Sequence, residues 1–368
     1  MAESSPFRWA ILGTGGVSRK FTLGLKAVPG QSAVVCASRS PDNAARFARD
    51  FGLETAEYAA AAAHPEADAV YIATPPSEHE AQALLAIGAG KPVLIEKPFA
   101  LDAAAAARIA DAAQTAGVFA MEAMWTRFLP LTRALKTRVE AGDLGQPRAF
   151  EARFYGNDRP DPGTSLFDPA RGGGALMHRG VYGLSLARHF LGPVAELQAM
   201  GRLGKTGVDE DCALTLRHEN GAISTIRAGL RAAGISGAEL YGTQTSYRIL
   251  PPLYRPFAAR RIAVPPRAGG TSGTSNGGGR LEGLKEGGVA QGLNQRLARL
   301  KEFLRPPGQG IAAPFAGNGY GHEAAALAEA VRAGRTEHAL MPLAESVEIM
   351  ALVDQARAAW GAGGEVRP

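Results

Sequence analysis

The first third of the chain alternates short apolar runs with longer alanine-rich stretches, and this alternation restricts the folds open to it. The apolar runs cover residues 8–12, 33–37, 69–73, 92–95 and 119–122. Stretches with helical periodicity lie between them, at residues 41–51, 77–87 and 102–116. Strands that alternate with helices form a parallel sheet with helices on both faces. We therefore predict a doubly wound α/β domain over residues 1–123.

The pattern changes after Met124, and the 368-residue length suits two domains. Residues 213–216 and 222–228 flank Asn220-Gly221, the strongest short signal for a hairpin of antiparallel strands. Further patterns predict a strand at residues 148–154 and helices at residues 174–190, 320–333 and 344–360. A second domain of α+β type is therefore expected over residues 124–368. Its Gly-, Ser- and Thr-rich segment, residues 268–288, is expected to be a flexible loop.

Charge and composition exclude several classes of protein. Lys and Arg number 40 against 35 Asp and Glu, a net charge of +5, and no stretch concentrates the cations as a nucleic-acid surface would. This small excess is read as mild attraction for anionic small molecules. No apolar run approaches the roughly 18 residues that cross a bilayer, and residues 1–6 do not resemble a signal peptide. The expectation is a soluble, cytoplasmic protein that contacts neither nucleic acid nor membrane.

Two cysteines, Cys36 and Cys212, are too few for a disulfide framework. Neither cysteine has the spacing of a metal ligand, so no metal site is expected.

A glycine-rich turn follows the first predicted strand. Gly13-Thr14-Gly15-Gly16-Val17-Ser18 is a loosened G-x-G-x-x-G, with Ser18 in the place of the third glycine. The first glycine makes a tight turn, and the second lets a pyrophosphate approach the N-terminus of the next helix. The position between a strand and a helix favours a dinucleotide site over an ordinary turn.

The residues after the second strand distinguish between two cofactors. An NAD enzyme usually has an acidic residue here that accepts from the ribose 2′-hydroxyl. This chain has Ser38-Arg39-Ser40 instead. A cation with two hydroxyls suits a 2′-phosphate, whereas an acid would repel it, so NADP is predicted rather than NAD.

Glu96-Lys97-Pro98 closes the fourth strand at its carboxyl end, where ligands bind in open α/β sheets. A lysine here can bind a substrate hydroxyl or a nicotinamide ribose. It can also lower the pKa of a neighbouring proton donor.

These motifs occur together with others in a recognisable order. They are the glycine loop, Ala73-Thr74-Pro75 with His79, Ala89-Gly90-Lys91, Glu96-Lys97-Pro98, residues 121–128, residues 172–176 and residues 206–210. The chain thus resembles the glucose–fructose oxidoreductase / inositol dehydrogenase family, and within it the dimeric dihydrodiol dehydrogenase branch. The resemblance covers most of the chain except residues 258–315.

The resemblance implies a Rossmann domain followed by an open-faced antiparallel sheet with helices on one side. It implies pairing through that sheet, as a homodimer or homotetramer. It also implies that one set of residues binds the cofactor: Gly13, Gly15, Gly16, Val17, Ser38, Arg39, Thr74, Pro75, His79, Glu96 and Lys97.

The same resemblance implies the catalytic residues. Tyr182 matches the general acid/base of the branch, with Lys97 as its partner, on the helix predicted at residues 174–190. His178 stands where many relatives have Asp, and positions four apart share a helix face, so it too is expected to face the site. Trp125, Phe154 and Tyr254 match aromatic positions that line the substrate pocket.

The sequence therefore predicts an NADP-dependent oxidoreductase acting on a carbinol carbon of a sugar, polyol or cyclic trans-diol. Two alternatives from other classes remain. A glycosidase that retains its NAD would hydrolyse aryl glycosides without net cofactor turnover. A catalytically silent sugar or nucleotide sensor would bind NADP and oxidise no polyol.

Overall fold

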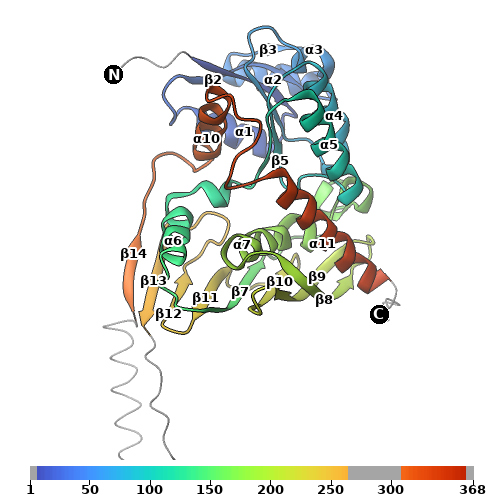
Figure 1. Ribbon diagram of the computed structural model, residues 1–368. Helices are drawn as coiled ribbons and strands as arrows, with labels where there is room; N and C mark the ends of the chain where they lie inside the picture. Colours follow the sequence, from blue (N-terminus) through green and yellow to red (C-terminus); the bar gives the residue numbers. More distant parts are fainter. Residues whose placement is uncertain (1–5, 264–307, 362–368) are drawn as a thin grey trace, which may run out of the picture.

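Two sheets and their helices make up the molecule (Figure 1). This computed structural model describes residues 6–263 and 308–361. The Gly-rich segment expected to be a flexible loop, residues 268–288, lies outside the described residues.

The first sheet has six strands in the order β3-β2-β1-β4-β5-β6, and all its pairs are parallel. Its strands are β1 (Phe7–Leu12), β2 (Gln31–Ala37), β3 (Glu54–Thr55), β4 (Ala69–Ile72), β5 (Val93–Glu96) and β6 (Ala120–Ala123). Its helices are α1 (Gly16–Leu25), α2 (Pro41–Phe51), α3 (Tyr58–Ala62), α4 (Pro76–Gly88) and α5 (Ala103–Ala116). The predicted doubly wound α/β arrangement is confirmed, although the short edge strand β3 carried no signal in the sequence.

Local sequence explains why these elements form where they do. Every residue of β4, β5 and β6 is buried, as expected for parallel strands covered on both faces. Ser40 and Asp102 cap α2 and α5 by accepting from the amides of Asn43 and Ala105. Both helices end at a left-handed glycine, Gly52 or Gly117, which satisfies the last carbonyl groups.

The second sheet has eight strands in the order β14-β13-β12-β11-β7-β10-β9-β8. They are β7 (Pro147–Tyr155), β8 (Val194–Leu203), β9 (Asp209–His218), β10 (Ile223–Gly229), β11 (Gly237–Gly242), β12 (Thr245–Ile249), β13 (Ala258–Ala263) and β14 (Gln309–Ala312). The predicted hairpin is confirmed as the antiparallel pair β9–β10. The expected antiparallel sheet is confirmed, with one parallel pair in it. β7 and β10 pair in parallel, because the chain crosses back over the sheet between them.

The helices of the second half are α6 (Pro130–Glu140) and α7 (Val181–Leu191), preceded by the 3-10 turns η1 (Trp125–Phe128), η2 (Ser165–Phe167) and η3 (Pro169–Arg171) and the π-helical turn η4 (Leu176–Gly180). In Figure 1, α6, α7 and the C-terminal helix α11 (Leu343–Gly361) lie on the side of the second sheet that faces the first.

The opposite face of the second sheet has no helix among the described residues. A Cβ on Gly201 would meet the Trp360 ring of α11 at 2.5 Å, so Gly201 points to the helix side. Its neighbour Met200 therefore points to the open face and is 79% exposed.

The C-terminal helices return to the first sheet. Helix α10 (Gly321–Arg332) packs on α1, where a Cβ on Gly24 would lie 2.9 Å from Tyr320. Gln31 Nε2 also donates to the carbonyl oxygen of Ala324 over 3.3 Å. Helix α11 is joined to α5 by a hydrogen bond of 2.8 Å from the Ala103 amide to Asp354. These contacts place the C-terminal helices against the first sheet's helices, although they follow the second sheet along the chain.

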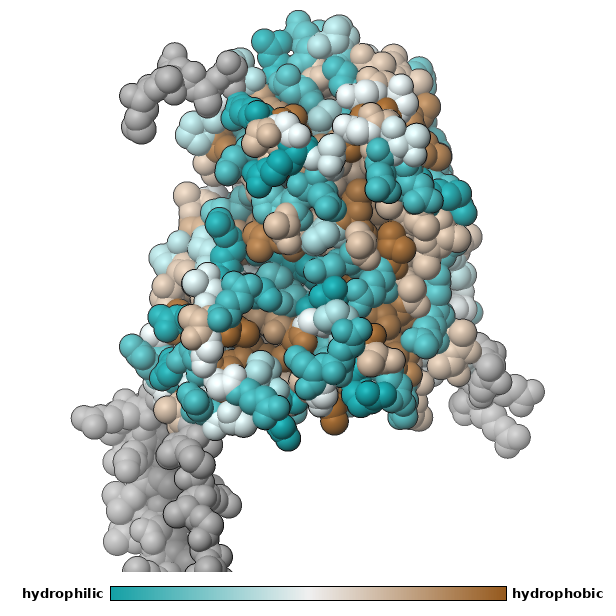
Figure 2. All heavy atoms as spheres, in the orientation of Figure 1, coloured by the Kyte–Doolittle hydropathy of each residue, from teal (hydrophilic) through white to brown (hydrophobic). Residues whose placement is uncertain are grey.

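On the face shown in Figure 2, hydrophobic residues form small groups separated by hydrophilic ones. None of the helices in the described part of the chain is both long and apolar enough to span a membrane.

Candidate active site

Two adjoining cavities open at the carboxyl ends of the first sheet's strands. The first, here called the loop cavity, measures about 660 Å³ and is bordered by the Gly13–Val17 turn and by Ser38, Arg39, Thr74 and Pro75. The second, the aromatic cavity, measures about 490 Å³ and is bordered by Trp125, Phe154, Tyr182, Tyr254 and Tyr320. Four residues border both cavities: Val17, Glu96, Lys97 and His178.

The glycine turn leaves a cradle at the N-terminus of α1. Gly13 has a φ of 96°, and a Cβ there would lie 2.7 Å from the carbonyl oxygen of Ala73. Only glycine fits this position. Gly15 and Gly16 have open space where a Cβ would be. The first amides of α1 can therefore receive a phosphate group at close range.

The end of β2 forms the next wall of the loop cavity. Ser40 is fixed as the cap of α2, and the amide of Arg39 donates to the Tyr58 hydroxyl over 3.0 Å. The guanidinium of Arg39 has no ion pair with any described residue. These residues and the glycine cradle fit a dinucleotide.

Three predicted cofactor residues follow β4, and the structure places two of them at the loop cavity and the third, His79, outside it. Thr74 and Pro75 border the loop cavity, and Thr74 Oγ1 donates to Gln82. His79 does not border either cavity. Its ring lies between the carbonyl oxygens of Thr74 (2.9 Å) and Pro98 (3.1 Å), and burial lowers its pKa to about 4. His79 is therefore a buried residue that links the segments after β4 and β5. It supports the wall of the cavity without bordering it.

Lys97 stands where the two cavities meet. Its Nζ donates to the carbonyl oxygen of His178 over 3.1 Å and lies 5.0 Å from the centroid of the Tyr182 ring. Burial lowers the pKa of Lys97, and the carboxylate of Glu96 opposes this effect. Glu96 accepts from the Tyr71 hydroxyl over 2.6 Å and from the Lys97 amide over 3.1 Å.

The phenol of Tyr182 is held by Trp125. Trp125 Nε1 donates to the Tyr182 hydroxyl oxygen over 3.1 Å. Burial raises the pKa of Tyr182, and the Trp125 hydrogen bond acts in the opposite direction. Tyr182 is therefore a neutral phenol at neutral pH in this state, with an indole donor already aimed at its oxygen.

His178 reaches the site by a different geometry from the one expected. The predicted regular helix over residues 174–190 is wrong in its first turn, because Leu176–Gly180 is π-helical and α7 begins at Val181. His178 still borders both cavities. Its Nε2 is buried without a hydrogen-bond partner among the described residues. Burial and then Lys97 lower the pKa of His178 to about 3, so its imidazole is neutral and cannot lower the pKa of Tyr182 by its charge.

Aromatic rings form one wall of the aromatic cavity. Phe154 stacks on Tyr254 with ring centroids 5.5 Å apart, and Tyr254 lies 5.9 Å from Trp125. Tyr320 stacks on Trp125 at 4.2 Å. The three aromatic residues predicted for this pocket are thus brought together with Tyr182.

Sequence reasoning missed several residues that border the cavities. They are Lys20, Asn43, Tyr58, Glu78, Ser165, Leu166, Arg171, Arg179, Arg255, Asn318 and Tyr320. Most lie in loops or helices whose local pattern carries no motif, and tertiary packing brings them to the site. The one available signal was Gly317-Asn318-Gly319-Tyr320, a turn with an aromatic residue placed before a predicted helix.

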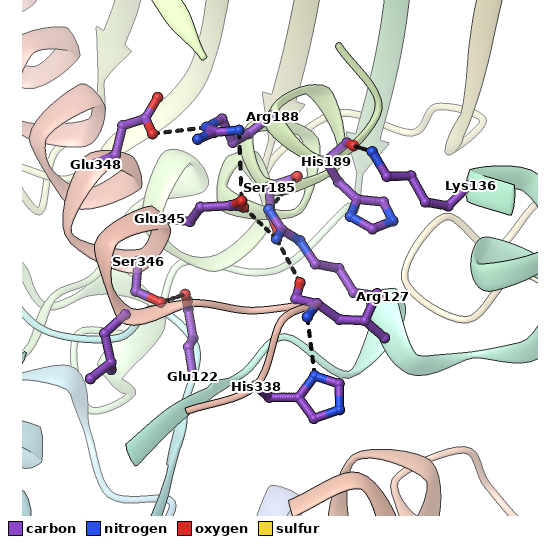
Figure 3. Close-up of polar contacts among 12 residues, drawn as sticks. Glu122, Arg127, Lys136, Ser185, Arg188, His189, His338, Glu345, Ser346 and Glu348 are labelled. Atoms are coloured by element: carbon purple, nitrogen blue, oxygen red, sulfur yellow. Dashed lines mark hydrogen bonds and ion pairs between the residues drawn. The ribbon is translucent and has the colours of Figure 1, made fainter. Parts of the chain in front are cut away.

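Behind the site, a buried arginine fixes α7, the helix that carries Tyr182 (Figure 3). Arg127 is fully buried, and its Nε and Nη2 donate to Ser185 of α7 over 2.7 Å. Its Nη1 pairs with Glu345 of α11 at 2.6 Å and also donates to the Leu340 carbonyl oxygen. Arg188 of α7 pairs with Glu348 at 2.8 Å. The network joins η1, α7 and α11, so these elements hold Tyr182 and Trp125 at a fixed separation.

Comparison with known proteins identifies the family. Residues 7–124 match the model of the oxidoreductase family with an NAD-binding Rossmann fold, and residues 132–248 match the GFO/IDH/MocA C-terminal domain. Trans-1,2-dihydrobenzene-1,2-diol dehydrogenase of Sus scrofa is 32% identical over 255 residues, which cover 68% of this chain and 76% of that protein. The chain belongs to the GFO/IDH/MocA oxidoreductase family.

Other known proteins match nearly the whole chain. D-xylose 1-dehydrogenase (NADP(+)) of Hypocrea jecorina is 28% identical over 395 residues, covering 97% of this chain and 93% of that protein. Among solved structures, the 3-ketoreductase KijD10 of Actinomadura kijaniata has a TM-score of 0.76 at 24% identity, covering 96% of this chain and 98% of that one. The resemblance expected from the motifs is confirmed, and the match to an NAD-binding Rossmann domain indicates a nicotinamide cofactor.

Proposed function

We propose that the protein is an NADP-dependent dehydrogenase that acts on a carbinol carbon of a sugar, polyol or cyclic diol. The observation that carries this proposal is the junction of the two cavities at Lys97 and His178. A nicotinamide reaching from the loop cavity and a hydroxyl in the aromatic cavity would meet there. The cofactor supplies the hydride chemistry, and the chain's own residues bind, orient and exchange the proton.

The preference for NADP over NAD rests on the end of β2. Arg39 makes no ion pair with any described residue, and Ser38, Ser40 and Tyr58 border the same cavity, as does the carboxylate of Glu78. A guanidinium and hydroxyls bind a phosphate monoester well. The NADP dependence in the name of the Hypocrea jecorina relative supports this preference.

Tyr182 is proposed as the general acid/base. In carbonyl reduction its neutral phenol donates a proton to the forming alkoxide. In alcohol oxidation it must accept one, and the Trp125 indole and the Lys97 ammonium then stabilise the phenolate. Since Lys97 lies over the ring and donates to His178, bound substrate would have to draw its Nζ toward the hydroxyls. His178 acts as a neutral wall whose main-chain carbonyl orients Lys97.

The protein is further proposed to pair through the open face of the second sheet. Met200 of β8 is 79% exposed there, and Ile223 of β10, on the same side of the sheet, is 48% exposed. Exposed apolar side chains on the sheet face that no described helix covers suit a self-complementary interface. Light scattering after gel filtration would measure the mass of the assembly. A monomer at micromolar concentration would contradict the proposal.

The decisive experiment is a panel of sugars, polyols and cyclic diols with NADP, followed by NADPH absorbance. We expect turnover of at least one member and much weaker turnover with NAD. Intact NADPH binding without oxidation or reduction of any panel member would contradict the dehydrogenase. Hydrolysis of an aryl glycoside without net NADPH formation would replace it by the glycosidase alternative.

A further inference from the structure

The aromatic cavity is bordered by more positive than negative charge. Four cations border it, Lys20, Lys97, Arg179 and Arg255, against a single carboxylate, Glu96. The cavity therefore has an excess of positively charged hydrogen-bond donors. This local ratio is much higher than that of the whole chain, which has 40 Lys and Arg against 35 Asp and Glu.

The inner charges already have partners within the protein. Arg179 pairs with Asp158 and donates to the carbonyl oxygen of Gly229. Both oxygens of Glu96 accept hydrogen bonds, from Tyr71 and from the amide of Lys97. The one carboxylate of the cavity thus already accepts two hydrogen bonds from within the protein.

The outer cations, Lys20 and Arg255, differ from these because both side chains are exposed. Neither the ammonium of Lys20 nor the guanidinium of Arg255 makes an ion pair or hydrogen bond with any residue that the structure describes. Both border the aromatic cavity and not the loop cavity, so they lie apart from the glycine cradle where the cofactor's phosphates would bind.

The main chain at both positions is anchored. Asn318 Nδ2 donates to the carbonyl oxygen of Lys20 over 2.6 Å. Thr126 Oγ1 donates to the carbonyl oxygen of Tyr254, next to Arg255, over 2.7 Å. Lys20 belongs to α1, beside the first sheet, and Arg255 to the turn between β12 and β13 of the second. Two free cations are thus presented to one cavity from two fixed positions.

We propose that the natural substrate carries an anionic group, a carboxylate or a phosphate, bound by Lys20 and Arg255 while its carbinol carbon faces Tyr182. A neutral sugar offers hydroxyls that donate as well as accept, and nothing in it calls for four cations around one cavity. A carboxylate or phosphate only accepts, and it matches ammonium and guanidinium donors. This inference rests on the proposed dehydrogenase function, because it concerns the substrate of that same site.

The test compares sugars that differ only in their charged group. Matched sets are D-glucose, D-glucuronate and D-glucose 6-phosphate, the same three forms of D-galactose, and D-xylose with D-xylose 5-phosphate. Each is titrated calorimetrically into the NADP-saturated protein. The uronates and the phosphates form separate arms that distinguish the two sources of negative charge. We expect an anionic member to bind at least about tenfold tighter than its neutral counterpart, with an advantage that shrinks as salt increases.

The variant Lys20→Gln/Arg255→Gln should remove this advantage, with a loss of about threefold to tenfold for each exposed cation. The matched control Lys26→Gln/Arg49→Gln removes two exposed cations elsewhere and should keep it. The affinity for NADPH, followed by its fluorescence, should stay unchanged in both double variants.

The inference is overturned if neutral sugars bind as tightly as their anionic forms, if no anionic member binds, or if the control variant loses the advantage equally. The same sugars are also assayed for NADPH formation. Oxidation of neutral sugars without anion preference would remove the inference and leave the dehydrogenase. Tight binding of an anionic sugar without oxidation of any member would support the anion site and contradict the proposed dehydrogenase function.

Discussion

At the residue scale, the chemistry depends on how the Tyr182 phenol gains and loses its proton. Burial raises the pKa of Tyr182, so alcohol oxidation should become faster as pH rises toward alkaline values, whereas carbonyl reduction should become slower. Tyr182→Phe removes the exchangeable proton and keeps the ring. We expect kcat to fall by about 10²-fold or more, the usual scale of general acid–base catalysis. Steady-state rates between pH 6 and 10 provide the measurement.

His178→Ala is the companion variant for this prediction. Because burial holds the pKa of His178 at about 3, its imidazole does not titrate in the working range. The variant should reduce kcat less than Tyr182→Phe and leave the shape of the pH profile intact. If His178→Ala abolished turnover while Tyr182→Phe kept wild-type rates, the two roles would be reversed.

A second prediction at this scale concerns Arg39 and cofactor choice. Arg39→Asp should weaken NADPH binding by about tenfold or more, because a charge-assisted contact to phosphate is replaced by repulsion. NADH has no 2′-phosphate, so its affinity should change little. Fluorescence titration of both nucleotides measures the effect. Arg49→Asp, an exposed charge change on α2, serves as the control, and equal wild-type affinities for NADP and NAD would contradict the prediction.

The residues that sequence could predict are those tied to a local pattern. Gly13 and Gly15 follow from a strand–turn–helix sequence, and Thr74 and Lys97 lie directly after apolar strands, so topology alone brings them to one edge. Tyr320 follows no such rule. It reaches the site because α10 packs on α1, a contact between segments about three hundred residues apart that no local pattern encodes.

At the scale of elements, Arg127 determines how α7 sits against its neighbours. Arg127→Ala should lower the free energy of unfolding by about 3–5 kcal/mol, because the buried bonds to Ser185 and Leu340 are lost and Glu345 keeps only Arg188, at 3.6 Å. Denaturant unfolding followed by circular dichroism measures the loss. Arg217→Ala is the matched control, since its pair with Glu196 is more than half exposed on both sides and should contribute at most about 1 kcal/mol. Equal losses in the two variants would contradict the proposed importance of the buried network.

Most helices and strands could be predicted from the sequence, but two features of the elements could not. The π-helical turn over Leu176–Gly180 has the same apolar pattern as an α-helix. It starts after Gly174, which has a φ of 121° and where a Cβ would clash with the Asp209 carboxylate. The parallel pairing of β7 with β10 depends on a crossover rather than on either strand's residues.

At the scale of the whole molecule, buried carboxyl groups should make stability depend on pH. Burial raises the pKa of Glu122 from 4.5 to about 7, and that of fully buried Glu323 well above its usual value. Below pH 4.5 both folded and unfolded chains hold the Glu122 proton. As pH rises toward 7 only the unfolded chain releases it, so the folded state loses stability, on the order of 3 kcal/mol from this group.

Glu122→Gln should therefore be more stable than wild type at pH 8 and similar at pH 4.5, since the amide can still accept from Ser346. Urea unfolding at several pH values measures the difference. Glu57→Gln replaces an exposed carboxylate and should follow the wild-type curve. A Glu122→Gln curve parallel to that of wild type would show that this carboxyl does not contribute to the pH dependence.

The packing of α10 and α11 against the first sheet's helices has a consequence for folding during synthesis on the ribosome. The residues of the first sheet emerge early, yet the helices that cover α1 and α5 are made only near the end of synthesis. Until then these apolar surfaces face water, which is the condition under which nascent chains aggregate or recruit chaperones. Helix α11 must therefore be synthesised before the nucleotide-binding half reaches its final packing. A nascent chain stalled before Gly321 should stay incompletely folded.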